Sequence, residues 1–348
     1  MTSVERVSAR AVTGGVDTHL DVHVAAVLDG IGGLLGVESF EASPAGNDKL
    51  LDWLRSFGAL APVGVEGTGS YGASLARSLR AAGVKVVEVD RPNRQARRRT
   101  GKSDPADAVE AARAALSGRS QGAGKTRDGN VEAMRALLVT RRSSRSMRVK
   151  TLCQIRHLLF TGPDELRERF QGLSHIMLPR EAATMRPRTG TDVVAYTTKL
   201  AVRTLARRVV ALDEETTHID ELLAVLVAET APSLLALHGV GVEGAASLLV
   251  TAGDNPGRLR SEAAWAHLCG VSPIEASSGK VVRHRLNRGG DRQANSALWR
   301  IVVVRMVSHA PTRAYVERRT KEGRSKREII RMLKRYVARE VYRHLPRA

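Results

Sequence analysis

GGVDTHLDVHVAAVLD, residues 14–29, places acidic and histidine side chains at alternate positions: Asp17, His19, Asp21 and His23. Alternate residues of a β-strand share one face, so an uninterrupted strand would present four potential metal ligands together. The alternative is a first strand that ends near Asp17, followed by a turn at THLD that leads into VHVAAVL. We favour the turn. Asp17 is then the ligand and Asp21 its fallback, whereas both histidines become turn and strand residues and a zinc site loses its ligands.

The composition predicts a polyanionic partner. The formal net charge of the 348-residue chain is +19 and its pI is about 10.8, which favours nucleic acid over an acidic membrane surface. Only 3% of the residues are aromatic, which favours phosphate contacts with a duplex over base-stacking platforms. Two cysteines do not make a disulfide framework, and no apolar run reaches the length of a signal peptide core or a membrane helix. We therefore expect a cytoplasmic protein.

Residues 10–120 alternate the signals of strands and helices, which predicts an α/β domain with a partly parallel sheet. The expected strands are residues 11–17, 22–29, 34–42, 61–66 and 84–90. The expected helices are residues 43–58, 71–83 and 103–118. Ser43 and Pro44 form an N-cap and N1 pair at the start of the first of these helices.

The rest of the chain reads as helical, with a basic and coiled-coil region over residues 130–230 and a mainly α domain over residues 232–348. In residues 196–229 an apolar residue recurs every seven positions, at Leu205, Leu212, Ile219 and Leu226. A heptad pattern predicts a coiled-coil arm, although a helix on a local core fits it equally well. One β-hairpin is expected near residues 277–287.

Four carboxylates are candidates for chemistry: Asp17, Glu66, Asp104 and Asp107. Asp17 and Glu66 end predicted strands, where ligands gather in α/β sheets, and Asp104 and Asp107 share a face at the start of a helix. An Asp after a strand is commonly a turn former, and Asp104 before Pro105 is commonly an N-cap. Glu66 is harder to explain in this way because a carboxylate in an apolar strand is costly unless it is paired. Converging carboxylates would bind Mg²⁺, or Mn²⁺, for phosphoryl transfer.

Two further features point to nucleic acid. Residues 91–102, RPNRQARRRTGK, hold six basic residues and no acid; they are either a solvated helix face or a contact for a phosphodiester backbone. The candidate contacts in this run are Arg94, Arg97, Arg98, Arg99 and Lys102. In LHGVGVEGAASLLV, residues 237–250, Gly239 and Gly241 have the spacing of a helix-hairpin-helix motif that binds phosphate, for which a plain helical hairpin is the alternative.

Five segments together resemble the successive motifs of IS110-type (IS116/IS110/IS902) transposases, also called DEDD recombinases. They are GVDTHLDVHVAAVLD, VGVEGTGSYG, RRRTGKSDPADA, LHGVGVEGAASLLV and LCGVSPIEASSGK. The resemblance spans nearly the whole chain. It implies an RNase H-like, RuvC-type N-terminal domain, a coiled-coil insertion and a C-terminal domain with a serine nucleophile. It departs from the pattern at Leu20, where relatives commonly have a lysine near a phosphate or RNA contact.

Carried over by motif, the resemblance implies a metal-binding acidic tetrad of Asp17, Glu66, Asp104 and Asp107. Ser278 matches the nucleophile best and Ser277 second, although two serines in a Gly-ended turn are by themselves commonly just a turn. Lys280, Arg283 and Arg285 would neutralise the reacting phosphate. The implied function is transposition of an insertion element with Mg²⁺, on double-stranded DNA, guided by a structured noncoding RNA, as a dimer or tetramer. The alternatives are a DNA invertase or metal-dependent junction nuclease on the same scaffold, and an inactive nucleic-acid-binding remnant.

Overall fold

The structure is a computed structural model that describes residues 10–89, 103–118, 124–188, 192–255, 257 and 259–346. It divides into two compact units. The N-terminal unit comprises residues 1–128 and 253–258, and the C-terminal unit comprises residues 129–252 and 259–348.

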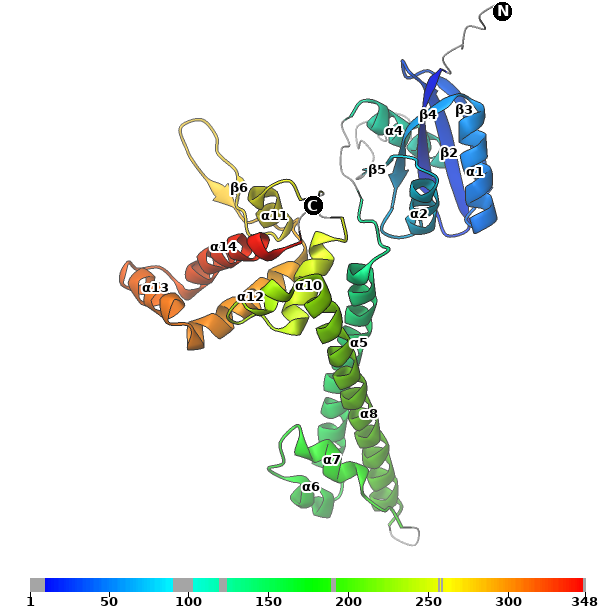
Figure 1. The fold of residues 1–348 in the computed structure, drawn as a ribbon. Helices are drawn as coiled ribbons and strands as arrows, with labels where there is room; N and C mark the ends of the chain where they lie inside the picture. The colour runs from blue at the N-terminus through cyan, green and yellow to red at the C-terminus, as the bar shows by residue number, and fades with distance from the viewer. Residues whose placement is uncertain are drawn as a thin grey trace, which may run out of the picture. The chain divides into compact units, whose positions relative to one another are not determined.

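The N-terminal unit is built on a five-stranded mixed sheet in the order β3-β2-β1-β4-β5 (Figure 1). The strands are β1 (Ala11–Thr18), β2 (Val22–Asp29), β3 (Leu34–Glu41), β4 (Ala59–Glu66) and β5 (Val86–Val89). The first three strands pair antiparallel, as short turns allow, whereas β4 pairs parallel with β1 and β5 pairs parallel with β4. This strand order is RNase H-like. All five strands predicted from the sequence are present.

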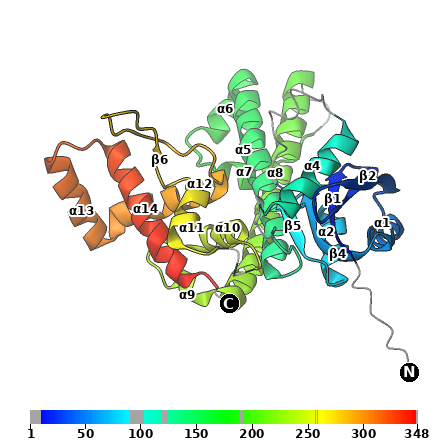
Figure 2. The ribbon, with the colours of Figure 1, turned by 90° about the horizontal axis from the view of Figure 1, so that it is seen from above.

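Helices cover both faces of this sheet, as Figures 1 and 2 show. One face carries α1 (Pro44–Ser56) and α2 (Ala73–Ala81), and the other carries α4 (Asp104–Leu116). The hydroxyl of Ser43 accepts a hydrogen bond from the amide of Gly46, so the predicted N-cap of α1 is confirmed. Val12, Val16, Val63 and Val65 form the core with the apolar side of α1 and α2.

Two glycines let α4 approach the other face of the sheet closely. A Cβ at Gly15 would lie 2.1 Å from the backbone nitrogen of Ala112, and one at Gly64 would lie 2.3 Å from the carbonyl oxygen of Ala111. Only residues without a side chain fit at such distances. The buried side of α4 is itself rich in alanine. This close contact fixes where the first turn of α4 meets the carboxyl ends of β1 and β4.

The C-terminal unit contains two long helices, α5 (Asn130–Thr161) and α8 (Val193–Thr230), that lie side by side (Figure 1). Their ion pairs, Arg141 with Asp220 and Arg148 with Asp213, show that they run antiparallel. Two short helices, α6 (Asp164–Phe170) and α7 (Met177–Ala183), pack against one end of the pair. Of the heptad residues of α8, Ile219 is buried and the three leucines are half-buried. A coiled coil with a second copy stays a prediction.

The other end of the helix pair joins the core of the remaining helices. These are α9 (Pro232–Leu235), α10 (Val242–Ala252), α11 (Glu262–Leu268), α12 (Arg292–Ser308), α13 (Ala310–Lys321) and α14 (Lys326–His344). Trp265 lies at the centre of this core and donates a hydrogen bond from its indole nitrogen to the carbonyl of Ala338. The strands β6 (Ile274–Glu275) and β7 (His284–Arg285) form the predicted hairpin. No described helix combines the length and the apolar composition needed to cross a membrane.

Candidate active site

Asp17 lies near the carboxyl end of β1 on the face of the sheet that α4 covers. Side chains alternate along a strand, so Asp17 points to the same side as Gly15, opposite to the core residue Val16. Only 7% of Asp17 is exposed. The strand therefore holds a carboxylate against the start of a helix, and this carboxylate is itself largely shielded from water.

The first turn of α4 supplies two more carboxylates. Ser103 is the N-cap residue, and Asp104 and Asp107 lie in the first turn, where the partial positive charge of a helix N-terminus favours acidic side chains. Asp107 is 3% exposed, on the helix side that packs on the sheet, whereas the side chain of Asp104 is half-exposed. Both carboxylates lie close enough to Asp17 to raise its pKa, and their membership of one site stays a prediction.

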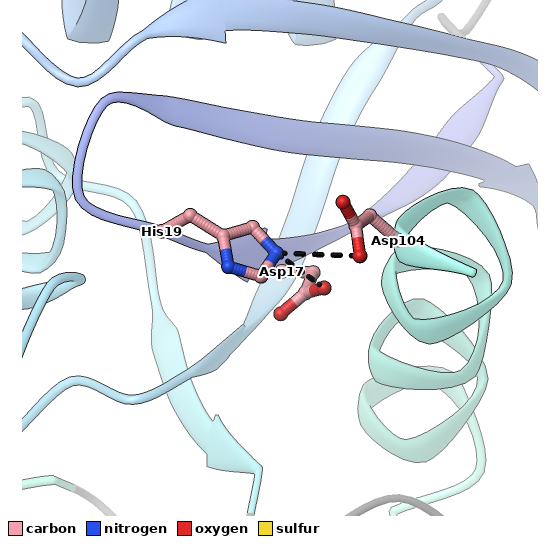
Figure 3. Close-up of side chains that lie close together, drawn as sticks. All are labelled: Asp17, His19 and Asp104. Atoms are coloured by element: carbon pink, nitrogen blue, oxygen red, sulfur yellow. Dashed lines mark hydrogen bonds and ion pairs between the residues drawn. The ribbon is translucent and has the colours of Figure 1, made fainter. Parts of the chain in front are cut away.

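His19 completes a cluster with two of these acids, which Figure 3 shows in close-up. Its Nε2 lies 3.1 Å from Oδ2 of Asp17 and 3.5 Å from Oδ1 of Asp104. One potential ligand atom from each of the three residues lies within 4.8 Å of the other two. His19 lies in the turn, as the sequence predicted, but the sequence did not predict that the turn would place its ring beside Asp17 and Asp104.

The other residues of the opening pattern do not join the cluster. His23 is buried in β2, and burial lowers its pKa. Asp21 is exposed in the β1–β2 turn, where its carbonyl accepts a hydrogen bond from the amide of Ala42. Leu20, in the same turn, is 67% exposed. The turn predicted at THLD is thus present and breaks the four-residue alternation.

Glu66 ends β4, the parallel neighbour of β1. Val65 pairs in register with Val16, so Glu66 and Asp17 occupy the next positions along their strands, on the face opposite the two valines. The hydroxyl of Thr18 donates a 2.8 Å hydrogen bond to the carbonyl of Glu66 and ties the two strand ends together. Gly67 follows with a φ of 72°, a conformation that favours glycine and turns the chain directly after the acid.

The electrostatics of the cluster favour a bound cation. Burial raises the pKa of Asp17, and the nearby carboxylates of Asp107 and Asp104 raise it further, whereas His19 lowers it by its charge and its hydrogen bond. Repulsion between acids and their burial raise the free energy of the folded protein, and a divalent cation that neutralises the acids stabilises it. Its donors are mainly carboxylate oxygens, which suit Mg²⁺ or Mn²⁺, and the imidazole of His19 is compatible with Mn²⁺ or zinc.

The serine pair lies in the C-terminal unit, on the hairpin formed by β6 and β7. Ser278 and Val281 exchange two backbone hydrogen bonds of 3.1 Å, so that Gly279 and Lys280 form the tip of the hairpin. Gly279 has a φ of 55°, as tight hairpin turns require. The Ser277 hydroxyl accepts a 3.2 Å hydrogen bond from the amide of Arg283. The Ser278 hydroxyl is exposed and has no hydrogen-bond partner among the described residues.

The remaining predicted nucleic-acid contacts fall in three places. Lys280, Arg283 and Arg285 are exposed on the same hairpin as the serines. Gly239, with a φ of 78°, turns the chain between α9 and α10, and a Cβ at Gly241 would meet no atom within 4 Å. The basic residues Arg94, Arg97, Arg98, Arg99 and Lys102 lie outside the described residues.

His19 is the residue of the cluster that sequence reasoning missed. The signal was present as an Asp–x–His spacing at the end of a predicted strand. A residue at the end of a strand and one in the turn that follows, such as Asp17 and His19, can lie at the same edge of the sheet when the turn folds back. The direction of the His19 side chain depends on how the β1–β2 turn closes, and its distance from Asp104 depends on where α4 lies. The local sequence pattern contains neither.

Known proteins resemble the chain in two regions. Residues 14–161 match the profile of the DEDD transposase domain of IS110 elements, described as "Transposase". Residues 231–317 match a profile described as "Transposase IS116/IS110/IS902 family".

A curated protein of Streptomyces coelicolor (strain ATCC BAA-471 / A3(2) / M145), "Insertion element IS110 uncharacterized 43.6 kDa protein", is 31% identical over 159 residues. These residues are 44% of this chain and 37% of that protein, so the aligned part spans little more than a third of the relative's length. The two family profiles lie at opposite ends of the chain, together cover more than half of it, and include both the acidic cluster and the serine hairpin. The chain belongs to the IS116/IS110/IS902 family of transposases and carries its DEDD transposase domain.

Proposed function

We propose that this protein is a DNA transposase that cuts and rejoins strands at the ends of an insertion element and at its target. The single observation that carries the proposal is the meeting of carboxylates from β1 and α4, Asp17 and Asp104, at the strand end next to Glu66 in an RNase H-like sheet. Family membership supplies the reaction class, phosphoryl transfer on DNA.

In this proposal Asp17, Glu66, Asp104 and Asp107 hold Mg²⁺, or Mn²⁺, with His19 beside them. The fit rests on the oxygen donors and on the raised pKa of Asp17, which burial and neighbouring acids cause. When bound, the metal would stabilise negative charge on the reacting phosphate. The protein's own contribution is to keep these carboxylates together on a closely packed sheet and helix, so that little rearrangement is needed on binding.

The proposed nucleophile is Ser278. Its hydroxyl oxygen forms a bond to the phosphorus while the bond from phosphorus to the oxygen of the leaving strand breaks. The serine proton passes through solvent to that leaving oxygen, and a phosphoserine linkage remains. A hydroxyl of the receiving strand then attacks the same phosphorus and releases Ser278. The free hydroxyl at the hairpin tip supports this choice over Ser277, whose hydroxyl is engaged with the amide of Arg283.

Cationic side chains and backbone groups in three parts of the chain would hold the DNA. Lys280, Arg283 and Arg285 flank the serine and would neutralise charge on the pentavalent phosphate. The turn at Gly239 and Gly241 would bind a backbone phosphate through the N-terminus of α10. The basic run 91–102 would add contacts to the phosphodiester backbone, and its net positive charge is the support for this role.

The broader parts of the proposal come from family resemblance. They are a RuvC-type catalytic domain over residues 10–120, a coiled-coil region over residues 130–230, a C-terminal transposase domain over residues 232–348, guidance by a structured RNA, and assembly into a dimer or tetramer. A strand exchange must hold several DNA ends at once, which favours more than one copy. The high positive charge suits both RNA and DNA.

Covalent trapping tests the proposal. The full chain is incubated with Mg²⁺, DNA of an element end and RNA transcribed from the element's flanks, then denatured and assayed for protein–DNA adduct. We expect adduct with the wild type and with the matched control Ser277→Ala, and none with Ser278→Ala. Adduct that survives Ser278→Ala excludes this nucleophile. Cleavage without adduct in the wild type indicates a metal-dependent nuclease, and binding without cleavage indicates an inactive remnant.

A further inference from the structure

The C-terminal unit contains a cavity of about 840 Å³ between the base of the hairpin, α12 and α14. Residues on both sides of the hairpin line it, Val271–Pro273 before β6 and Leu286–Arg288 after β7. The volume falls within the range of small-molecule sites, roughly 300–1,000 Å³. Figure 1 shows the hairpin rising beside α11 and α14. A molecule in this cavity would therefore lie at the foot of the element that carries Ser278.

The lining of the cavity is cationic and includes no acidic residue. Arg335 and Arg339 are paired with Glu262. Four other cations have no salt bridge to any described residue: Arg288, Arg292, Arg331 and Lys334. Lys334 is half-buried and donates a 2.8 Å hydrogen bond to the side-chain oxygen of Asn295. Cations gathered without acids favour an anionic ligand.

Two aromatic side chains also line the cavity. No ring contact of Trp299 is found among the described residues, whereas the Tyr336 ring packs edge-on with Tyr315 and lies under the guanidinium of Arg339, 6.0 Å from the ring centroid. Trp299 of α12 is 47% exposed and Tyr336 of α14 is 48% exposed. Trp265, the other tryptophan of the C-terminal unit, is by contrast fully buried in the core. A large aromatic face left open beside unpaired cations is the combination that binds a base together with its phosphate.

We propose that this cavity binds an unpaired nucleotide of single-stranded DNA or RNA, with its base against Trp299 or Tyr336 and its phosphates against Arg292, Arg331 and Lys334. The inference rests on the proposed function, which requires strands that are opened and exchanged. A paired and stacked base of a duplex does not present its face to a side chain, so the aromatic contact selects unpaired nucleotides. The cavity would then hold a displaced strand or a guide strand near the serine hairpin.

The aromatic contact is tested with three 12-residue oligomers: thymidine DNA, uridine RNA, and an abasic phosphodiester with no bases. Binding to the full chain is measured by fluorescence anisotropy. We expect Trp299→Ala to weaken binding to at least one base-carrying oligomer about tenfold, the scale of a lost base stack, and to leave abasic binding unchanged. Trp299→Phe should restore most of the affinity. The thymidine and uridine arms distinguish DNA from RNA as the source.

Phe160→Ala is the matched control, since Phe160 is an exposed aromatic residue of α5 outside the cavity. It should change none of the affinities. For the cations, Arg292→Gln should reduce the slope of log affinity against log salt by about one for all three oligomers. Equal losses for base-carrying and abasic oligomers would overturn the aromatic role, and unchanged binding in Trp299→Ala would overturn the proposal.

Failure of this inference is distinguishable from failure of the proposed function. If wild type forms the Ser278 adduct but Trp299→Ala binds every oligomer normally, transposition stands and the nucleotide cavity does not. If wild type forms no adduct but shows the Trp299-dependent preference for bases, the cavity stands without the reaction. A thermal melt of each variant that matches the wild type excludes misfolding as the cause.

Discussion

The acidic cluster and the serine hairpin place the two proposed reactive groups in opposite surroundings. Asp17 is almost completely buried on a central strand, and α4 packs over it on glycine and alanine contacts too close for other side chains. Ser278 stands exposed at a hairpin tip, held by backbone hydrogen bonds alone. In the proposed function, the buried acids form a preorganised charge site, and a bound nucleic acid would complete the surroundings of the exposed serine. Substitutions in the two regions should accordingly have different consequences.

The largest effect is expected for Asp17→Asn. Removing a metal-binding carboxylate should lower the rate of adduct formation about a thousandfold, because several kcal/mol of charge stabilisation in the transition state are lost. The measurement is a time course of covalent trapping with saturating Mg²⁺. A loss below about tenfold, which corresponds to about 1.4 kcal/mol, would contradict the role of the buried cluster as the centre of the chemistry.

Although Asp17→Asn should lower activity, we expect it to raise the stability of the metal-free protein. Because the folded-state pKa of Asp17 lies above its ordinary value of 3.8, its contribution to stability is most favourable below that value and is lost as pH rises through the folded-state pKa. At neutral pH without metal, Asp17→Asn should therefore unfold at a higher denaturant concentration than the wild type. Added Mg²⁺ should stabilise the wild type and not the variant. Equal stabilisation of both would show that Asp17 does not hold the ion.

A smaller effect, on folding, is expected from glycine substitutions in the two regions. At Gly15 a Cβ would lie within the backbone of α4, so Gly15→Ala should cost about 3 kcal/mol of stability. Gly279→Ala is the matched control at the hairpin tip: nothing lies within 4 Å of its Cβ position, and the strain of a positive φ should cost about 1 kcal/mol.

The measurement for these two glycine variants is amide hydrogen exchange, followed separately in strands β1 to β4 and in the hairpin. Protection should fall across the sheet in Gly15→Ala and only around residues 277–283 in Gly279→Ala. If Gly15→Ala leaves the sheet amides protected, the close approach of α4 is not what holds the acids in place. The contrast between Asp17, held in place by packing, and Ser278, exposed on the hairpin, would then lose its physical basis.

The sequence predicted the acidic region far better than the rest because its signals are local. Asp17 and Glu66 each end a predicted strand, and Asp104, Pro105 and Asp107 mark a helix start, so local rules predicted that these acids lie at one sheet edge. The cap itself is Ser103 and not Asp104. The contact that brings α4 onto the sheet depends on Gly15 and Gly64, which lie far from it in the chain. The sequence alone gives no sign that these two glycines contact α4.

Features that depend on distant packing were not predicted. The cavity beside the hairpin needs α12 and α14, which place Trp299 and Tyr336 on one lining although they are far apart in sequence. An aromatic content of 3% argued against base stacking because composition averages over the chain, whereas a binding site needs only a few rings in one place. For the serine, the local pattern indicated a turn, and family resemblance alone indicated chemistry.

The smallest effect on adduct formation is expected at His19, and it tests whether the cluster includes more than its acids. His19 hydrogen-bonds Asp17 at 3.1 Å and lowers its pKa, so its loss should leave Asp17 harder to ionise and less ready to bind a cation. His19→Ala should raise the Mg²⁺ concentration for half-maximal adduct formation about tenfold, as is typical for groups that orient metal ligands. The deficit should shrink as the pH rises, because Asp17 ionises at higher pH despite its raised pKa. His284→Ala, on the exposed hairpin, is the control and should need no more Mg²⁺ than the wild type. A larger Mg²⁺ requirement in His284→Ala than in His19→Ala would place the metal-sensitive step at the hairpin and reverse the roles assigned to the two regions.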